Sequence, residues 1–457
     1  MNLLHIAWRN MQQRGFATLL TMFSMALGVA LVVLVLSVSW TITESFDRNS
    51  NVGYNLIVGA RGGSLQLVLN SVFYLSKPIE VLPYDDYLEF LPGDERSEEI
   101  KRVGGRIADP DRPGEHAKYM DGGFAIPICL GDYFGPFRVV GTTPDFFDKL
   151  RYGRASDLEY KFSEGRNFVD HSPEHGFYEA VLGSQVAATM NKKVGDSLQT
   201  THGDPEGMGH GEAFTIVGIL ASTGTPNDRA AFINIEGFYL MDNHARAFVD
   251  PAHPDELKVD VPREASDAPA RLPLEKRDVV AVLVKPANGS YAVFLERPIN
   301  KTMRMQAVSP ISEISGMLEM FVAPVKNALL GLTIVVCIVS AISILVSIYN
   351  SMSDRRRDIA VMRALGARRD VVLVVVLLES MLIACIGGAI GWLAGHGIGV
   401  ACADMVEERT GLQIGFFNTI TVYELTLIPG LVLLATLAGI IPALVAYRTD
   451  VSKNLGA

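Results

Sequence analysis

"SDRRRDIAVMRALGARRD" (Ser353–Asp370) sets six arginines between two long apolar segments of the chain. Arginine and lysine gather in the short cytoplasmic loops that join membrane-spanning helices. The stretch therefore indicates that both flanking segments cross a membrane and that the loop at 351–370 lies in the cytoplasm.

The apolar residues of this 457-residue chain, 49% of the total, gather in four blocks instead of being spread evenly. About 20 apolar residues are needed to cross the core of a bilayer as a helix. A cleaved signal peptide is the alternative for the first block, but its apolar region would usually be only about 7–15 residues long. We therefore predict four transmembrane helices, at 16–42, 328–350, 371–400 and 425–446.

Basic residues near the two ends of the chain orient these helices. Arg9 and Arg14 precede the first block, and Arg448 and Lys453 follow the last one. Because such residues favour the cytoplasmic side, both termini are predicted to lie inside. Residues 1–15 then form a cytoplasmic amphipathic helix and 447–457 a cytoplasmic tail, while 43–320 and the short loop 401–424 lie outside.

The charge balance agrees with this orientation. The three predicted cytoplasmic segments together carry a net charge of +6, so the rest of the chain carries −16 within a total of −10. A strongly acidic exterior would repel the phosphates of a nucleic acid. Nucleic acid is therefore excluded as the partner of the outer domain.

The outer domain at 43–320 alternates short strand-like runs with helical patches, which is typical of an α+β fold. Cys129 is its only cysteine, so its core must hold it without an internal disulfide. Gly59, Gly62 and Gly63 resemble a phosphate-binding loop, but no G-x-x-x-x-G-K-[ST] pattern occurs in the sequence. H-E-x-x-H and G-x-S-x-G are also absent from it, so the sequence predicts no enzyme activity for this chain.

One segment of the outer domain, "THGDPEGMGHGE" (Thr201–Glu212), combines histidines with carboxylates. Such side chains can bind zinc or copper. The spacing is irregular and the segment is rich in glycine, so a solvated loop between two strands is the competing interpretation. The candidate metal ligands are His202, Asp204, His210 and Glu212.

The spacing of the apolar residues in the arginine-rich loop predicts a short amphipathic helix. Ile359, Met362 and Leu365 recur at three-residue steps, while Ser353 and Gly366 are suitable cap residues. Such a helix can rest on anionic lipid, or it can be a docking element for a cytoplasmic protein. The sequence pattern leaves both interpretations open.

The third predicted span carries a carboxylate and several glycines. A carboxylate inside a span is costly and often functional, and we expect a structural or coupling role for Glu379 rather than proton or ion transport. Small residues at intervals of about four let helix backbones approach closely. The glycines expected to do this are Gly387, Gly388, Gly391 and Gly395.

Two neighbouring stretches, "RRRDIAVMRALGARRDVV" (Arg355–Val372) and "LLESMLIACIGGAIGWLAG" (Leu377–Gly395), resemble the FtsX-like permeases of ABC transporters, the group that includes MacB and LolCE. The family pattern is matched after the second span, and Glu379 matches a glutamate that enters the third span. The matching loop residues are Arg357, Ile359, Arg363, Ala364, Leu365, Gly366 and Ala367.

The resemblance implies a fold of four transmembrane helices with a large outer domain between the first two, in the inner membrane of a bacterium. It also implies a second permease copy, a separate ATPase subunit that binds ATP and Mg²⁺, membrane lipid around the spans and a possible periplasmic or outer-membrane partner. ATPase closure would move the outer domains (mechanotransmission), for efflux, lipoprotein release or control of cell-wall hydrolases. No cofactor is expected in this chain, and the residues alone leave a membrane-anchored metal-binding or sensor module as the alternative. The coupling residues that the resemblance implies are Arg355, Arg356, Arg357, Ile359, Met362, Arg363, Leu365 and Gly366.

Overall fold

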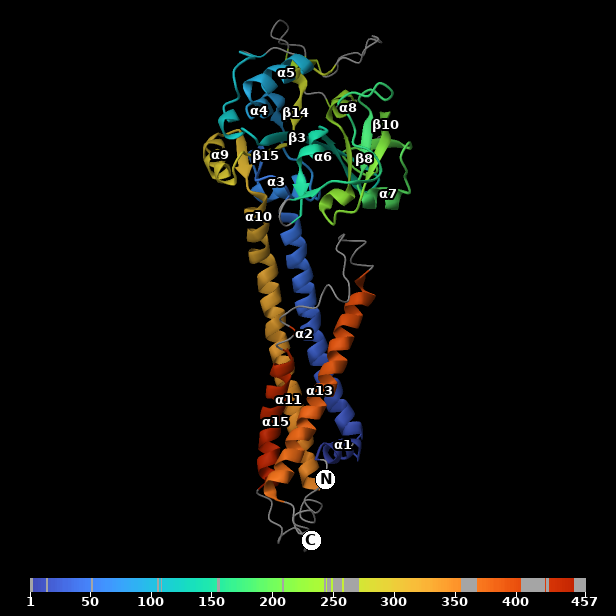
Figure 1. Ribbon diagram of the computed structural model, residues 1–457, viewed down its shortest axis with the longest axis vertical. Helices are drawn as coiled ribbons and strands as arrows, with labels where there is room; N and C mark the ends of the chain where they lie inside the picture. Colours follow the sequence, from blue (N-terminus) through green and yellow to red (C-terminus); the bar gives the residue numbers. More distant parts are fainter. Residues whose placement is uncertain are drawn as a thin grey trace. The chain divides into compact units, whose positions relative to one another are not determined.

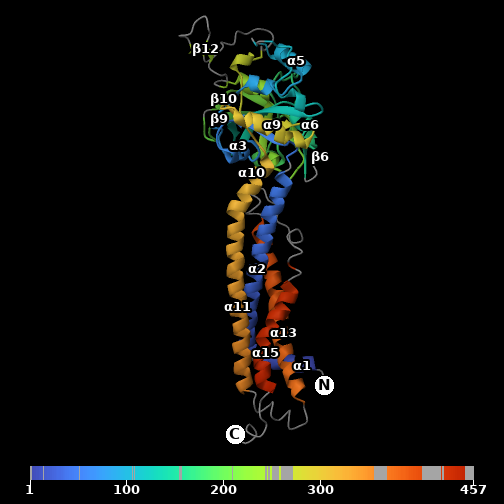
Figure 2. The same ribbon diagram turned by 90° about the vertical axis from the view of Figure 1, so that its left-hand side faces the viewer.

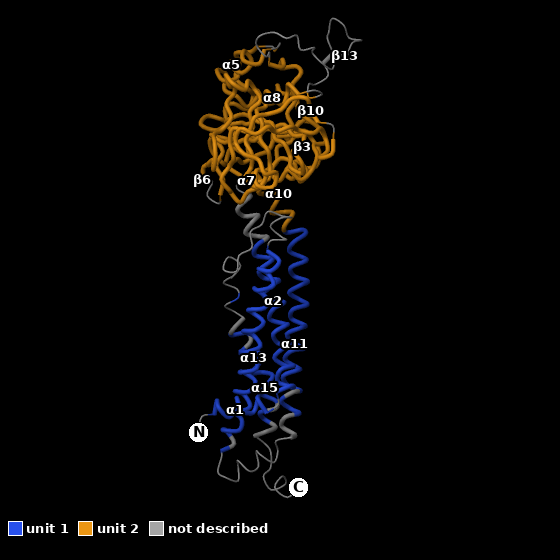
Figure 3. The backbone as a smooth tube through the Cα atoms, turned by 90° about the vertical axis from the view of Figure 1, so that its right-hand side faces the viewer, with its two compact units in different colours: residues 1–44, 319–457 blue, residues 45–318 orange. Residues whose placement is uncertain are grey.

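The computed structural model describes most of the chain and divides it into two compact units (Figure 3). Unit 1 contains Met1–Glu44 and Glu319–Ala457, and unit 2 contains Ser45–Leu318. The residues described are 3–13, 15–50, 52–104, 107, 109–153, 157–207, 209–241, 244, 248–249, 257–258, 271–354, 368–403, 424 and 427–447.

Unit 1 is built from helices (Figure 1). Three stretches of the chain are long and apolar enough to cross a membrane, at Gly15–Thr41, Pro310–Asn350, which begins in unit 2, and Asp370–Ala401. The last helix carries a shorter apolar stretch, Val432–Ile441, among the described residues. The helices are α1 (Leu3–Gln13), α2 (Gly15–Ser50), α11 (Ala323–Asp354), α13 (Arg369–Ala401) and α15 (Leu427–Tyr447).

Within unit 1, α2 and α11 lie side by side (Figure 2). Ser340 on α11 donates a hydrogen bond to the Ser24 carbonyl oxygen, at 3.2 Å. Gly28 on α2 faces Val336, whose side chain a Cβ at that glycine would meet at 3.3 Å. A small residue and a hydroxyl pair therefore bring these two backbones together, as is common between helices in a membrane.

Unit 2 is organised around one mixed ten-stranded sheet. Its path runs β16-β1-β15-β3-β4-β11-β8-β10-β7, and β9 pairs with both β10 and β3. The β4–β11 and β8–β10 pairs are parallel, and the other pairs are antiparallel. The strands are β1 (Leu56–Ala60), β3 (Phe124–Phe134), β4 (Phe137–Thr142), β7 (Phe162–Gly165), β8 (Glu179–Leu182), β9 (Ser197–His202), β10 (Gly209–Leu220), β11 (Ala230–Asn234), β15 (Ala281–Lys285) and β16 (Met305–Val308).

Both faces of this sheet are covered, because successive side chains of a strand point to opposite faces. On β1, Val58 lies in one hydrophobic cluster and Ile57 in the other. On β15, Val282 and Leu283 divide in the same way. Helices on the Val58 side are α4 (Tyr84–Leu88), α5 (Gly93–Val103), α7 (Ser184–Met190), α8 (Ile235–Leu240) and α9 (Gly289–Lys301); those on the Ile57 side are α3 (Ser64–Ser71), α6 (Asp145–Lys149) and α10 (Pro310–Met317).

Short elements complete unit 2, which has the α+β build that the alternation of strands and helical patches predicts. They include a π-helical segment, η4, that begins at Leu318, where the chain passes into unit 1. The π-helical segment spans Leu318–Val322. The remaining elements are the strand pairs β2 (Leu82–Pro83) with β14 (Asp278–Val279), β5 (Arg151–Tyr152) with β6 (Leu158–Glu159) and β12 (Phe248–Val249) with β13 (Leu257–Lys258), and the 3-10 helices η1 (Ala117–Tyr119), η2 (Pro226–Arg229) and η3 (Leu274–Lys276).

Candidate functional site

The expected coupling loop falls where the structure gives no description. Its flanks are described: α11 ends at Asp354 and α13 begins at Arg369. The exposed Arg368 guanidinium lies 3.0 Å from the Asp370 carboxylate in the first turn of α13. The residues outside the described part of the chain are Arg355, Arg356, Arg357, Ile359, Met362, Arg363, Leu365 and Gly366.

The glycines of α13 lie against α2, at steps of four residues. A Cβ at Gly387 would lie 3.0 Å from the Met22 carbonyl oxygen, and one at Gly391 would overlap the Ala26 carbonyl oxygen. One at Gly395 would lie 2.9 Å from Val33. Only hydrogen fits between the two backbones at these positions. The neighbouring Gly388 is also buried.

Glu379 is buried within unit 1, with 3% of its surface exposed. The next residue, Ser380, donates a hydrogen bond to the Leu377 carbonyl oxygen at 2.8 Å. A Cβ at Gly439 of α15 would lie 2.5 Å from the Ser380 hydroxyl. The structure therefore places the Glu379 turn of α13 against α15, inside the helix packing rather than on an outer face.

A second polar cluster in unit 1 joins α13 to residue 424. The Trp392 indole donates a hydrogen bond to Glu424 Oε2 at 2.9 Å, and His396 Nε2 lies 2.9 Å from the same oxygen. The His396 and Glu424 side chains are 0% and 4% exposed, and Trp392 is half-buried. The sequence places Trp392 and His396 on one helix face, four residues apart, but it gives no signal that Glu424 joins them.

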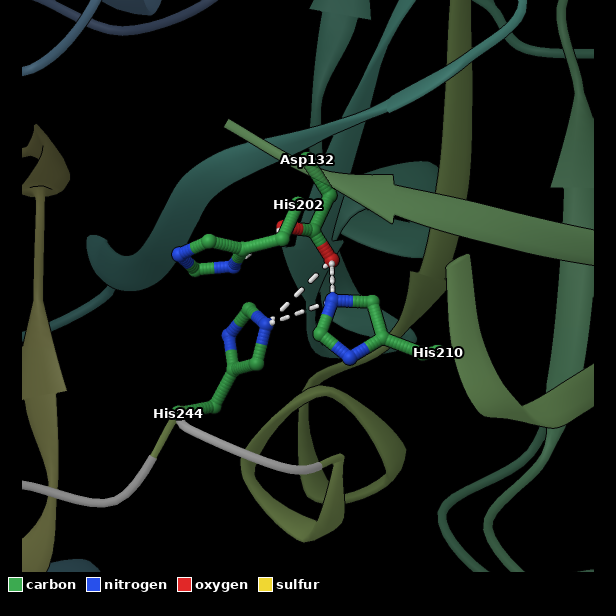
Figure 4. Close-up of side chains that lie close together, drawn as sticks. All are labelled: Asp132, His202, His210 and His244. Atoms are coloured by element: carbon green, nitrogen blue, oxygen red, sulfur yellow. Dashed lines mark hydrogen bonds and ion pairs between the residues drawn. The ribbon is translucent and has the colours of Figure 1, made fainter. Parts of the chain in front are cut away.

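In unit 2, four side chains with metal-binding atoms come together: Asp132, His202, His210 and His244 (Figure 4). Their ligand atoms all lie within 4.8 Å of one another. His202 Nδ1 is 3.4 Å from Asp132 Oδ1, while His210 Nε2 and His244 Nε2 are 3.2 and 3.3 Å from Oδ2. Three imidazoles thus converge on one carboxylate.

Strand pairing creates this arrangement. Asp132 on β3 is the direct antiparallel partner of His202 on β9. His210 lies at the start of β10, which pairs with β9. The ring of His244, a few residues after α8, packs edge-on against Phe238, with the ring centres 4.3 Å apart.

The electrostatics of the cluster favour a neutral imidazole beside a buried carboxylate. The Asp132 side chain is fully buried, and those of His210 and His244 are 4% exposed. Burial lowers the pKa of His210, and this outweighs the opposing effect of the Asp132 charge. His202 is the accessible member, with 52% of its side chain exposed.

Two of the four ligands predicted from the sequence lie elsewhere. The Asp204 carboxylate pairs with Lys77 at 2.7 Å, and Glu212 is not among the four clustered residues. Asp132 and His244 were missed, because they lie far from the histidine-rich segment along the chain. Only knowledge that β3 pairs with β9 could have pointed to Asp132.

Comparisons with known proteins match two regions of the chain. Residues 18–290 match the family described as MacB-like periplasmic core domain, and residues 330–451 match the family described as FtsX-like permease C-terminal. The first match alone covers more than half of the chain.

Three curated relatives illustrate the similarity. An uncharacterized ABC transporter permease of Methanocaldococcus jannaschii is 24% identical over 65% of this chain and 65% of its own length. The macrolide export ATP-binding/permease protein MacB of Syntrophobacter fumaroxidans is 26% identical over 61% of this chain, but only 42% of its own length is covered. The uncharacterized ABC transporter permease YvrN of Bacillus subtilis is 22% identical over 86% of each chain. The chain thus spans less than two thirds of the first two relatives.

Proposed function

The chain belongs to the FtsX-like permeases of ABC transporters that carry a MacB-like periplasmic core domain, and we propose that it transmits ATP-driven motion from a separate cytoplasmic ATPase to its outer domain. The observation that carries this proposal is the presence of both family regions in one multi-pass membrane chain. The arginine-rich loop between α11 and α13 is then the surface on which the ATPase pushes.

The proposed topology has four spans, with α15 as the fourth, in the bacterial inner membrane. Both termini and the 351–370 loop lie in the cytoplasm, because the basic residues collect there. Unit 2 lies in the periplasm. Two copies of the permease assemble with two ATPase subunits that bind ATP and Mg²⁺, and the moved or released molecule contacts unit 2 or a partner of it.

The lengths of two helical segments support mechanical transmission. The stretch Gly15–Ser50 contains 36 residues, and the helical stretch Pro310–Asn350 contains 41. At about 1.5 Å per residue they are about 54 and 60 Å long, whereas a bilayer core is about 30 Å thick. Each segment is therefore longer than is needed to cross the membrane core.

The burial of Glu379 fits the same mechanism. Glu379 is buried beside the contact between α13 and α15, and it lies two to three helical turns after Arg369 at the start of α13. We propose that it couples the loop to the helix packing and does not carry protons or ions.

The decisive test is a double substitution in the loop, Arg363→Glu with Leu365→Asp. It reverses one charge and removes one apolar contact of the proposed docking helix. We expect the variant to be inserted in the membrane and purified in the same yield as the unmodified chain. The ATPase activity that co-purifies with it should fall at least about ten-fold, which is equivalent to about 1.4 kcal/mol.

The matched control is Lys301→Glu with Met303→Asp, which makes the same kind of change at the same spacing on the exposed surface of unit 2. It should leave ATPase recovery and activity as in the unmodified chain. Equal activity in the loop variant and in the control would contradict the proposal.

A further inference from the structure

We propose that Asp132, His202, His210 and His244 form a binding site for a divalent first-row transition metal ion, with Zn²⁺ as the best fit. This inference is independent of ATPase coupling, since it concerns only side chains of unit 2. It adds a ligand to the outer domain that the permease function does not require.

The distances between the ligand atoms match a tetrahedral site. Zinc binds histidine nitrogen and carboxylate oxygen at about 2.0–2.2 Å, so two ligands on one tetrahedron lie about 3.3 Å apart. His210 Nε2 and His244 Nε2 are 3.3 Å from each other and 3.2 and 3.3 Å from Asp132 Oδ2. These three atoms form one complete face of the tetrahedron.

His202 supplies the fourth ligand. Its Nδ1 lies 3.4 Å from the other carboxylate oxygen and within 4.8 Å of every other ligand atom. Its side chain is half exposed, and its ring lies edge-on to those of His210 and His244, with the ring centres 5.6 and 5.3 Å apart. The same exposure gives the ion a way in, while the other three side chains form a buried floor.

The Asp132 carboxylate provides the second, independent observation. It is fully buried, and its oxygens face the three imidazoles at 3.2 to 3.4 Å without accepting a well-aligned hydrogen bond from any residue that the structure describes. Burying a charged group without hydrogen bonds is costly. A divalent cation bound between this carboxylate and the three imidazoles would compensate that cost directly.

The chemistry of the ligands selects the class of ion. Imidazole suits zinc, copper, nickel and iron, whereas Ca²⁺ and Mg²⁺ require a shell of oxygen ligands. Four protein ligands complete a tetrahedron and leave no position for a reacting water, which is the arrangement of a structural zinc site. The site therefore binds or senses the ion rather than using it for hydrolysis.

The surrounding backbone holds these ligands in place. Gln199 donates a hydrogen bond to the His210 carbonyl oxygen at 2.6 Å, and the His244 backbone N–H donates to the Met241 carbonyl oxygen at 3.4 Å. The register of β3 against β4 shifts between Leu130 and Tyr133, and such an irregularity re-aims a side chain. An ion bound here would link β3, the β9–β10 hairpin and the chain after α8.

The experiment uses the full chain in detergent micelles after treatment with a chelator, with Zn²⁺ and Co²⁺ as probes. We expect one Zn²⁺ per chain, bound more tightly than about 1 μM. Bound Co²⁺ should give the intense visible absorption bands of a tetrahedral complex, and Zn²⁺ should raise the unfolding temperature of unit 2 because it binds only the folded state. The absence of Zn²⁺ binding at about ten times that concentration, or an octahedral Co²⁺ spectrum, would overturn the proposal.

Substitutions locate the ion. His210→Ala should abolish the Co²⁺ bands, and His202→Ala, which removes the half-exposed ligand, should weaken binding about 10- to 100-fold. The matched control is Asp204→Asn, two residues from His202 but paired with Lys77, and it should bind as tightly as the unmodified chain. Unchanged binding in His202→Ala, or equal loss in Asp204→Asn, would refute this assignment even if His210→Ala fails to fold.

Discussion

The two units of this permease are packed by different kinds of contact. In unit 2, the fully buried Arg277 and Glu236 form a two-pronged ion pair with N–O distances of 3.0 and 2.6 Å, and Arg102 and Arg271 approach the same carboxylate. In unit 1, the α2–α13 contact depends on glycines such as Gly391 that carry no side chain at all.

The physical reason for this difference is the solvent around each unit. Unit 2 is compact because its folding buries apolar surface away from water. A charged side chain inside it must be paired, so each buried ion pair determines which two side chains meet. Between helices in lipid no such driving force exists, and association depends on close packing and on hydrogen bonds. Substitutions should therefore act through lost charge compensation in unit 2 and through added volume in unit 1.

The largest effect is expected at the buried ion pair. Glu236→Gln leaves the Arg277 guanidinium buried without its counter-charge, and breaking a buried pair costs about 3–5 kcal/mol. The unfolding temperature of unit 2 should fall accordingly, as followed by near-ultraviolet circular dichroism of the detergent-solubilised chain.

The control for that substitution is Asp145→Asn, which removes an exposed partner of Lys149. Exposed pairs of this kind contribute about 0–1 kcal/mol, so little change is expected. If both variants lose the same stability, buried charges do not hold unit 2 together in the way we describe.

The next effect concerns the glycine contact of unit 1. Gly391→Ala places a Cβ against the Ala26 backbone, and overpacking of this kind costs about 1–3 kcal/mol. Gly397→Ala on the same helix has no atom within 4 Å of the added carbon, so it should be neutral or stabilising, because alanine favours a helix by about 1 kcal/mol over glycine. Thermal unfolding in detergent measures both effects. If both substitutions lower the unfolding temperature, or both raise it, the backbones of α2 and α13 are not in close contact at Gly391.

The smallest effect is a dependence on pH in unit 2. Burial alone would raise the pKa of Glu179, but hydrogen bonds from Arg166 and the Val169 backbone, with the Arg166 charge, bring it below its ordinary value. At pH values above the ordinary pKa of 4.5, the ionised Glu179 contributes its full stabilisation to the folded state. This contribution is lost as the pH falls through the lower pKa of the folded state.

Glu179→Gln should therefore flatten the decline of unit 2 stability below about pH 4.5, by no more than about 1.4 kcal/mol per pH unit because one proton is involved. Glu164→Gln, at an exposed site on β7, should leave the decline unchanged. Chemical denaturation at several pH values measures the difference, and identical slopes for all three chains would exclude Glu179 as the group concerned.

Local patterns in the sequence predict the main elements of the fold. Long uncharged runs and the arginines at 355–369 predict membrane-spanning helices around a cytoplasmic loop, because hydropathy and loop charge act within one segment at a time. The four-residue steps from Gly387 to Gly395 likewise predict a helix face for close contact, although the helix that meets it is not visible in the sequence. Short alternating strands between the first two spans predict an α+β outer domain.

Contacts between distant segments were decided only by the tertiary structure. The segment at 201–212 offers two histidines, but the carboxylate and the third imidazole come from Asp132 and His244, through the pairing of β3 with β9 and the position of the chain after α8. Arg277 and Glu236 meet in the same way across 41 residues. Such side chains meet because strands pair and helices pack so that whole apolar faces are buried. The spacing of residues within one segment does not contain this information.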